Sequence, residues 1–302
     1  MDGLAYMDGR IVPLAEAKVP LLDWGFLRSD ACQDTVSVWN GAFFRLDDHI
    51  ERFLRSCARL RLTAPERSEL VRTLDRLVAA SGLRRAYVQM LVTRGLSAPG
   101  SRDPRSCRNS FMAFCLPYIT IAPKSAAGLR LKISERTRIA PQSVPSDIKN
   151  YHWIDFELAL FDALEAGFDS TVLIDAEGDV TEGPGFNIFA SVAGELVTPG
   201  FNMLQGITRR TVIELAAELG IPCRIAPLSP QALRTAEEAF ACSTAGGIVP
   251  VTEVDGRRLG EGAPGPRTSL LHAEYWQRRE AGWLGTPVGY EAAETVLAGE
   301  AS

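Results

Sequence analysis

Several features that mark common protein classes are missing from this chain of 302 residues. Histidine occurs only 3 times and the 6 cysteines form no CxxC pair, so the sequence offers no ligand set for a metal site. No stretch approaches the roughly 20 apolar residues of a membrane helix, and the N-terminus MDGLAYMDGR lacks the positive charge of a signal peptide. We therefore expect no metal, no membrane partner and a cytoplasmic protein.

Familiar catalytic and nucleotide-binding motifs are also missing. Neither GxxxxGK[ST] nor GxGxxG occurs, which excludes a P-loop or Rossmann interpretation, and without GxSxG nothing supports a serine hydrolase. The net charge of −5 disfavours a nucleic-acid-binding surface. With 46% hydrophobic and 23% charged residues, the composition is that of a globular protein with one large domain or two moderate ones.

Hydrophobic periodicity in the first part of the chain predicts a mixed α/β (α+β) domain over residues 1–116. The expected elements are a hairpin turning at Asp8-Gly9, a Gly turn at Gly25, helices from residue 48 and over 66–80, and strands over 84–95 and 110–121. Asp47 or Asp48 is suited to cap the first of these helices, and Arg52 should point away from its core face. The polar loop 97–109 is of the kind that often lies over a site.

An irregular run of small residues over 117–127 predicts the connection to a second α/β domain, residues 128–302. There we expect a strand over 129–139, a helix from Trp153 to Gly167, several short antiparallel strands, and an amphipathic helix ending at Gly220. The tail from residue 285 to 302 is expected to be frayed.

The neighbours of two side chains make them candidate functional residues. A lysine that forms a Schiff base must be desolvated to lower its pKa, and Lys149 is followed by Tyr151 and Trp153, which can wall a pocket. Glu182 enters a Gly-Pro-Gly turn between strands, where a rigid carboxylate can keep a ring nitrogen protonated. Taken singly, each is more simply explained as a solvated surface group. Their occurrence together favours a cofactor site.

Two turns have the composition of a phosphate-binding site, in which backbone N–H groups at a helix start or in a glycine-rich turn donate hydrogen bonds to an anion. The residues are Gly206, Ile207 and Thr208 in LQGITRR, and Ser243, Thr244 and Ala245 in CSTAGG. Arg52 could complete such a phosphate-binding site with a bidentate contact to the phosphate. Alone, either turn is weak evidence, because most helix starts are only caps.

In their order along the chain, six segments resemble the class IV family of pyridoxal-phosphate (PLP) enzymes. They are RLDDHIERFLRS, VTRG, SDIKNYHW, VTEGPGFNIF, LQGITRRTV and CSTAGG. LLDWGFLRSD, KNYHW and GAPGP are most similar to (R)-selective amine transaminases, with D-amino-acid and branched-chain transaminases more distant. The resemblance implies a two-domain fold-type IV enzyme, similar to D-amino-acid aminotransferase. It also implies PLP between the domains, a C-terminal domain carrying the PLP lysine, and a homodimer.

The resemblance also implies roles for residues. Lys149 is similar to the lysine that forms the Schiff base with PLP and moves the substrate Cα proton, and Glu182 to the carboxylate at the pyridine nitrogen. The implied phosphate ligands are Arg52, Ile207, Thr208 and Thr244, within the two turns that also contain Gly206 and Ser243. The implied substrate-binding positions are Arg28, Gln33, Trp153 and Ala245, with Arg102 or Arg105 as the mobile arginine that pairs with a keto-acid carboxylate.

The activity implied is transfer of an amino group from an (R)-amine or D-amino acid to an α-keto acid such as pyruvate, through a Lys149 Schiff base. The partners would be small-molecule amines and α-keto acids. Gln33 and Thr35 replace an aromatic and a small aliphatic residue of relatives, which makes the pocket more polar and leaves substrate choice open. A branched-chain L-amino-acid transaminase, a lyase like aminodeoxychorismate lyase, and a PLP-binding protein without turnover remain as alternatives.

Overall fold

The chain forms two compact units in the computed structural model, which describes residues 2–121 and 128–290. The first unit comprises Met1–Ile119, Ile148–Tyr151 and Arg279–Ser302, and the second comprises Thr120–Asp147 and His152–Arg278. The division expected from the sequence is 1–116 and 128–302. Residues 122–127 of the expected connection lie outside the described residues.

An antiparallel sheet organises the first unit. Among the described residues its strand order is β16-β4-β3-β5-β6-β1-β2. The strands are β1 (Leu4–Met7), β2 (Arg10–Pro13), β3 (Ala31–Trp39), β4 (Ala42–Phe44), β5 (Ala86–Leu96), β6 (Arg108–Pro117) and β16 (Gly285–Pro287). The hairpin turn at Asp8-Gly9 is confirmed, with φ of 49° and 81°, as a two-residue primed turn requires.

The expectation of a frayed tail is wrong at its beginning. Gly285–Pro287 pairs with β4, because the edge of that strand offers unpaired backbone groups that another strand can satisfy. Residues 291–302 of the tail lie outside the described residues.

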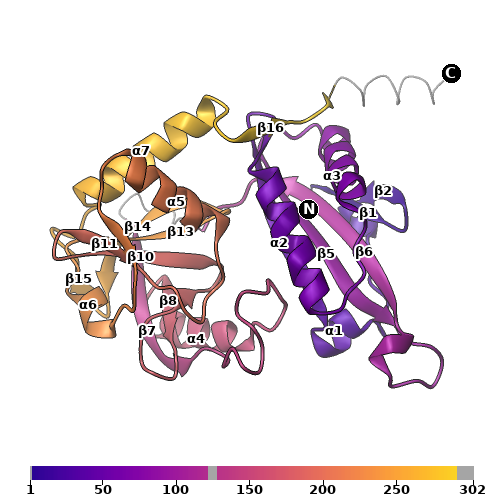
Figure 1. Ribbon diagram of the computed structural model, residues 1–302, viewed down its shortest axis with the longest axis horizontal. Coiled ribbons are helices and arrows are strands. Elements are labelled where there is room, and N and C mark those ends of the chain that lie inside the picture. The colour runs from indigo at the N-terminus through magenta and orange to yellow at the C-terminus, as the bar shows by residue number, and fades with distance from the viewer. Residues whose placement is uncertain (1, 122–127, 291–302) are drawn as a thin grey trace. The chain divides into compact units, whose positions relative to one another are not determined.

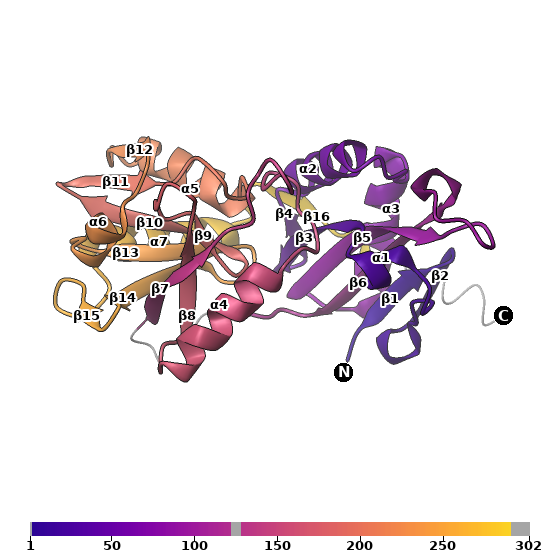
Figure 2. The same cartoon turned by 90° about the horizontal axis from the view of Figure 1, so that it is seen from below.

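Two helices lie on one face of the first sheet (Figures 1 and 2). The helical segments of this unit are η1 (Leu14–Glu16), α1 (Trp24–Arg28), α2 (Leu46–Arg59), α3 (Arg67–Ser81) and η2 (Pro104–Ser106). The covering helices are α2 and α3, which bury Phe53 and Leu74 in a core shared with Val36 and Val88 of the sheet. Alternation along the strands selects these residues, since every second side chain faces the helices.

Two helix starts differ from expectation. Arg45, in the left-handed region with φ of 52°, occupies the N-cap of α2, so Asp47 and Asp48 lie in the first turn instead. There they still face the positive end of the helix dipole. Gly25 is not a turn but part of α1, because the Asp23 carboxylate accepts a hydrogen bond from its N–H at 2.7 Å and caps the helix.

The second unit is built on a mixed sheet. Among the described residues its main order is β12-β11-β10-β13-β14-β7-β8, with β15 beside β14 and β9 beside β10. The strands are β7 (Leu129–Thr137), β8 (Ser170–Ile174), β9 (Glu182–Gly183), β10 (Phe186–Val192), β11 (Glu195–Thr198), β12 (Cys223–Ile225), β13 (Ala239–Ser243), β14 (Gly247–Val254) and β15 (Arg257–Arg258). β7 runs parallel to both β8 and β14.

The helices of the second unit each follow one of its strands in the chain. They are α4 (Ile154–Glu165), α5 (Ile207–Glu218), α6 (Pro230–Arg234) and α7 (Pro266–Glu280). Parallel strands need a long crossover, and α4 provides it between β7 and β8, lying along both strands (Figure 2). Within residues 2–121 and 128–290, no helix has the length and apolar character needed to cross a membrane.

The first unit's core allows a stability prediction. Phe53 is completely buried, so Phe53→Ala should lower the free energy of unfolding by about 3–5 kcal/mol, through lost burial and the cavity left behind. Arg67→Ala breaks only an exposed ion pair with Asp47 and should cost less than about 1 kcal/mol. Urea unfolding of both variants checks this, and equal losses would contradict the assignment of the core.

Candidate active site

The backbone of Lys149 is fixed by the first unit. Its carbonyl accepts a hydrogen bond from the Gln33 N–H at 2.9 Å, and its N–H donates to Ser56 Oγ at 3.4 Å. The next residue, Asn150, forms an antiparallel bridge with Cys32. Lys149 therefore lies beside the start of β3. It also lies beside α2, at Ser56, which is one helical turn beyond Arg52. These contacts hold the Lys149 backbone from two sides.

Arg52 is buried, and the expectation that it points away from the core is wrong. Its side chain is 5% exposed and pairs with Asp34 on β3, with Nε to Oδ2 at 2.7 Å and Nη2 to Oδ1 at 2.8 Å. His49 Nδ1 lies 2.8 Å from Asp34 Oδ1. Asp34 is on the sheet face that α2 covers, and a buried carboxylate must be paired. This requirement turns Arg52 and His49 toward the sheet.

The pKa values in this cluster shift in consistent directions. Burial alone would raise the pKa of Asp34, but the charge and hydrogen bonds of Arg52, with the hydrogen bond from His49, hold it well below its ordinary value. Burial lowers the pKa of His49, and although Asp34 opposes this shift, the charges of Arg52 and Lys149 add to it. At neutral pH the cluster is therefore an anion, a cation and a neutral imidazole.

A row of uncharged polar groups lies on the other face of β3. Thr35 Oγ1 donates to Gln33 Oε1 at 3.2 Å and lies 3.3 Å from Tyr87 Oη. Tyr87 Oη donates to Gln89 Oε1 at 3.2 Å, and Gln89 Nε2 donates to Tyr151 Oη at 2.7 Å. Burial raises the pKa of both tyrosines, so they stay protonated. Gln33 thus belongs to a hydrogen-bond network that ends at Tyr151, two residues after Lys149 in the sequence.

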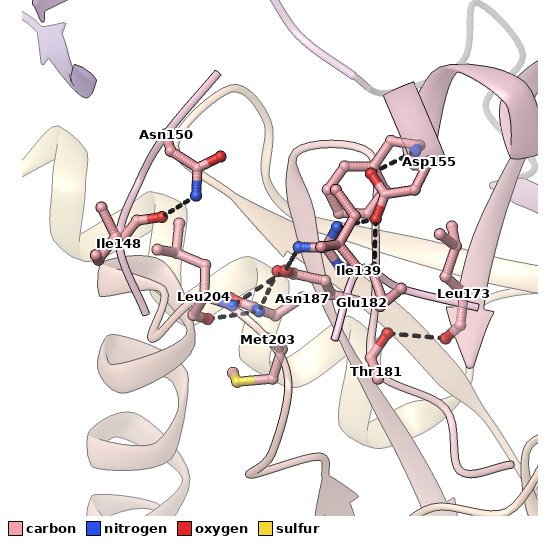
Figure 3. A network of polar contacts seen from close by, with 12 residues as sticks. Ile139, Ile148, Asn150, Asp155, Leu173, Thr181, Glu182, Asn187, Met203 and Leu204 are labelled. Carbon is pink, nitrogen blue, oxygen red and sulfur yellow. Dashed lines mark hydrogen bonds and ion pairs between the residues drawn. The ribbon is translucent and has the colours of Figure 1, made fainter. Parts of the chain in front are cut away.

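Glu182 is buried in the second unit and held by three donors (Figure 3). Its Oε1 accepts from the Leu204 N–H at 3.1 Å and from Arg138 Nη2 at 3.3 Å, and its Oε2 accepts from Asn187 Nδ2 at 3.3 Å. Glu182 and Asn187 are register partners of β9 and β10, which brings their side chains together. The carboxylate is therefore fixed in orientation.

The same contacts fix the start of α5. Asn187 Nδ2 also donates to the Leu204 carbonyl at 2.9 Å, and Gly206 is the N-cap of the helix. A Cβ at Gly206 would lie 2.0 Å from Asn187 Oδ1, so only glycine allows this approach. Ile207 and Thr208, both buried, form the first turn, where backbone N–H groups lack helical acceptors. The second unit thus joins Glu182 to the predicted phosphate turn.

The second predicted turn lies beside the Glu182 loop as well. Ser243 Oγ donates to the Gly185 carbonyl at 2.9 Å and accepts from the Ala245 N–H at 3.2 Å, so this hydroxyl is used within the turn. Thr244 lies between them in the turn and is half-buried. A Cβ at Gly185 would lie 3.6 Å from the Trp153 ring. Trp153, Glu182 and both phosphate turns are therefore neighbours within one unit.

The three substrate-binding arginines expected in the first unit differ in environment. Arg28, at the end of α1, lies with its guanidinium carbon 3.3 Å from the centre of the Trp24 ring. Arg105 pairs with Asp103, with Nη2 to Oδ2 at 2.6 Å, in an exposed turn. Arg102 is exposed, and within residues 2–121 and 128–290 no carboxylate pairs with it. Of the two loop arginines, Arg105 is the one with a carboxylate partner in the described part of the chain.

Four residues that hold the site lie outside the expectations from sequence. Asp34 and Asn187 carry a weak local signal, since Asp34 is the one charged residue of the buried strand β3 and Asn187 lies among the apolar residues at the start of β10. Arg138 and Asp155 carry none, because their partners lie far away in the sequence. In the described part of the chain, no three His, Cys, Asp or Glu side chains gather so as to hold a metal ion.

Comparison with known proteins identifies the family of this chain. The family model for class IV aminotransferases matches residues 31–254. The chain is 31% identical over 278 residues to a D-alanine aminotransferase of Listeria innocua, covering 88% of this chain and 92% of that protein. It is 30% identical over 285 residues to a branched-chain-amino-acid aminotransferase of Pseudomonas aeruginosa, covering 91% and 92%. The PLP form of a Thermobaculum terrenum branched-chain amino acid aminotransferase matches with a TM-score of 0.84 and 28% identity, covering 95% and 98%.

The buried imidazole predicts a pH dependence of stability. Because the pKa of His49 in the folded chain lies below its ordinary 6.5, the unfolded chain binds the proton more readily. The free energy of unfolding should therefore be undiminished above pH 6.5 and fall as the pH decreases from there, by at most about 1.4 kcal/mol per pH unit. His49→Gln should flatten this dependence in urea unfolding between pH 7.5 and 5.5. Identical pH slopes for both proteins would contradict the assignment.

Proposed function

Because the chain belongs to the class IV aminotransferases and is a PLP-dependent enzyme, we propose that it moves an amino group from a branched-chain L-amino acid to an α-keto acid. The names of the Pseudomonas and Thermobaculum proteins support this donor. It corresponds to one of the alternatives left open by the sequence. Transfer from a D-amino acid or (R)-amine is the second candidate, supported by the Listeria D-alanine aminotransferase.

The residues present fit PLP, and the observation that carries this is the link between Glu182 and the start of α5 through Asn187. A carboxylate and a helix N-terminus held together suit a ligand with a basic ring nitrogen at one end and a phosphate at the other. Ile207, Thr208 and Thr244 would bind the phosphate, and Arg52 is proposed as a further phosphate ligand. Bound PLP supplies an electron sink for the negative charge that develops on the substrate α-carbon.

The chain's own residues would do the remaining work. Lys149 would hold the cofactor, release it to the incoming amine, and carry the proton from the substrate α-carbon. Its anchored backbone keeps the amine within reach during both half-reactions. Glu182 would keep the proton on the ring nitrogen, because a fixed carboxylate stabilises the adjacent cation.

Substrate recognition is assigned to the remaining predicted residues. We propose that Arg102 binds the carboxylate of the keto acid, since Arg105 is already paired with Asp103. Trp153, Ala245, Arg28 and Gln33 are proposed as the other residues that contact the substrate. The neutral network that includes Gln33 offers hydroxyl and amide groups but no charge.

The homodimer implied by the family resemblance also stays a proposal. The segment before and within α1 exposes Val19, Leu21, Leu22, Phe26 and Leu27, each at least 48% accessible. Contiguous exposed apolar residues of this kind are typical of surfaces covered by another subunit. Light scattering of the purified protein measures the subunit number directly.

Replacing the lysine tests the assignment of Lys149. Lys149→Ala should lower kcat by about 10²- to 10⁴-fold, because the proton carrier is lost. It should also abolish the visible absorbance that the protein gains with PLP. Lys18→Ala, an exposed lysine far from the site in sequence, is the matched control and should behave as wild type. Wild-type turnover by Lys149→Ala would exclude the mechanism.

A substrate panel separates the candidate functions. Leucine, D-alanine, (R)-1-phenylethylamine and (S)-1-phenylethylamine are each assayed with pyruvate and with 2-oxoglutarate. We expect kcat/KM for leucine with 2-oxoglutarate to exceed the others by about 10-fold or more, since pocket contacts discriminate by one to a few kcal/mol. A higher value with D-alanine or the (R)-amine would favour the second candidate. Release of pyruvate without consumption of a keto acid would identify a lyase.

A further inference from the structure

Arg138 links two buried carboxylates in the second unit. It follows directly after β7, and its Nη1 donates to Asp155 Oδ2 while its Nη2 donates to Glu182 Oε1 at 3.3 Å. The side chains of Arg138, Asp155 and Glu182 are 9%, 8% and 6% exposed. At this depth an unpaired charge is costly, and the guanidinium is paired with both carboxylates.

The outer half of this link is rigid. Asp155, in the first turn of α4, also accepts hydrogen bonds from the Ile139 N–H at 3.1 Å and the Phe156 N–H at 2.9 Å. The Arg138 guanidinium lies 4.0 Å above the centre of the Phe156 ring. A planar guanidinium that is stacked on a ring and paired on one edge has one orientation. Its second Nη group is therefore directed at Glu182.

We propose that Arg138, held by Asp155, is a positioning residue that keeps Glu182 ionised and correctly oriented toward the ring nitrogen of the cofactor. This inference rests on the proposed role of Glu182. A guanidinium hydrogen bond favours the carboxylate over the carboxylic acid, and only the carboxylate stabilises a protonated ring nitrogen. Leu204 and Asn187 fix the position of Glu182 but contribute no charge.

The experiment compares variants that change the charge of Arg138, the geometry of its side chain, or a matched ion pair elsewhere. Arg138→Gln removes the charge, and Arg138→Lys retains it without the fork geometry. Arg136→Gln is the control, since Arg136, near the end of β7, also pairs with a carboxylate of α4, Asp162, but at 46% and 43% exposure. The readouts are the ¹⁵N chemical shift of the ring nitrogen in holoenzyme with ¹⁵N-labelled PLP, its pH dependence, and the division of effects between kcat and KM.

For Arg138→Gln we expect the ring-nitrogen signal to move from the pyridinium toward the pyridine range. We also expect kcat to fall by about 10- to 100-fold, as is typical when a residue supporting a site is lost. KM should change by less than about 3-fold, because the substrate does not contact Arg138. Arg138→Lys should lie between this variant and wild type, and Arg136→Gln should match wild type.

An unchanged ring-nitrogen signal in Arg138→Gln, or an equal change in Arg136→Gln, would overturn the inference. If Arg138→Gln does not fold, Asp155→Asn decides the matter, because it releases one anchor of the guanidinium, and an unchanged signal there is equally negative. Glu182→Gln separates this inference from the proposed function. If Glu182→Gln leaves the signal unchanged, the role of Glu182 itself is wrong, whereas a shift in Glu182→Gln alone rejects only the role of Arg138.

Discussion

The cost of burying a carboxylate shapes both units of this protein. Glu182 and Asp34 are both buried, and a buried charge must be met by donors. The donors to Glu182 come from the end of β7, from β10 and from the loop before α5. Pairing this single acid therefore ties three separated segments together and fixes the start of α5.

In the first unit, Asp34 has the corresponding effect on α2. The pairing of Arg52 and His49 with this carboxylate sets which face of the helix meets β3. Ser56, one turn further along the same helix, accepts the hydrogen bond from the Lys149 N–H. The helix that holds Arg52 thus also anchors the proposed catalytic lysine, so the placement of both depends on one buried ion pair.

Neighbouring residues of β3 place their polar groups on opposite faces of the first sheet. β3 presents Asp34 to the helices, and its neighbours Gln33 and Thr35 to the opposite face, where amides and hydroxyls form a connected row. Because the side-chain period of a strand is two, adjacent residues serve different functions. The face toward the helices holds the buried ion pair, and the opposite face carries amides and hydroxyls.

The sequence determined the motifs and most local elements, since these depend on short-range periodicity and turn chemistry. The hairpin at Asp8-Gly9, and α3 over Arg67–Ser81, formed close to the expected residues, and the family resemblance rested on contiguous segments. Only the tertiary structure decided that Arg52 is buried, that Gly285–Pro287 joins the first sheet, and that Arg138 supports Glu182. Each of these depends on a partner distant in the chain. The free energy of burying a charge or pairing a strand edge cannot be read from the residues next to it in the sequence.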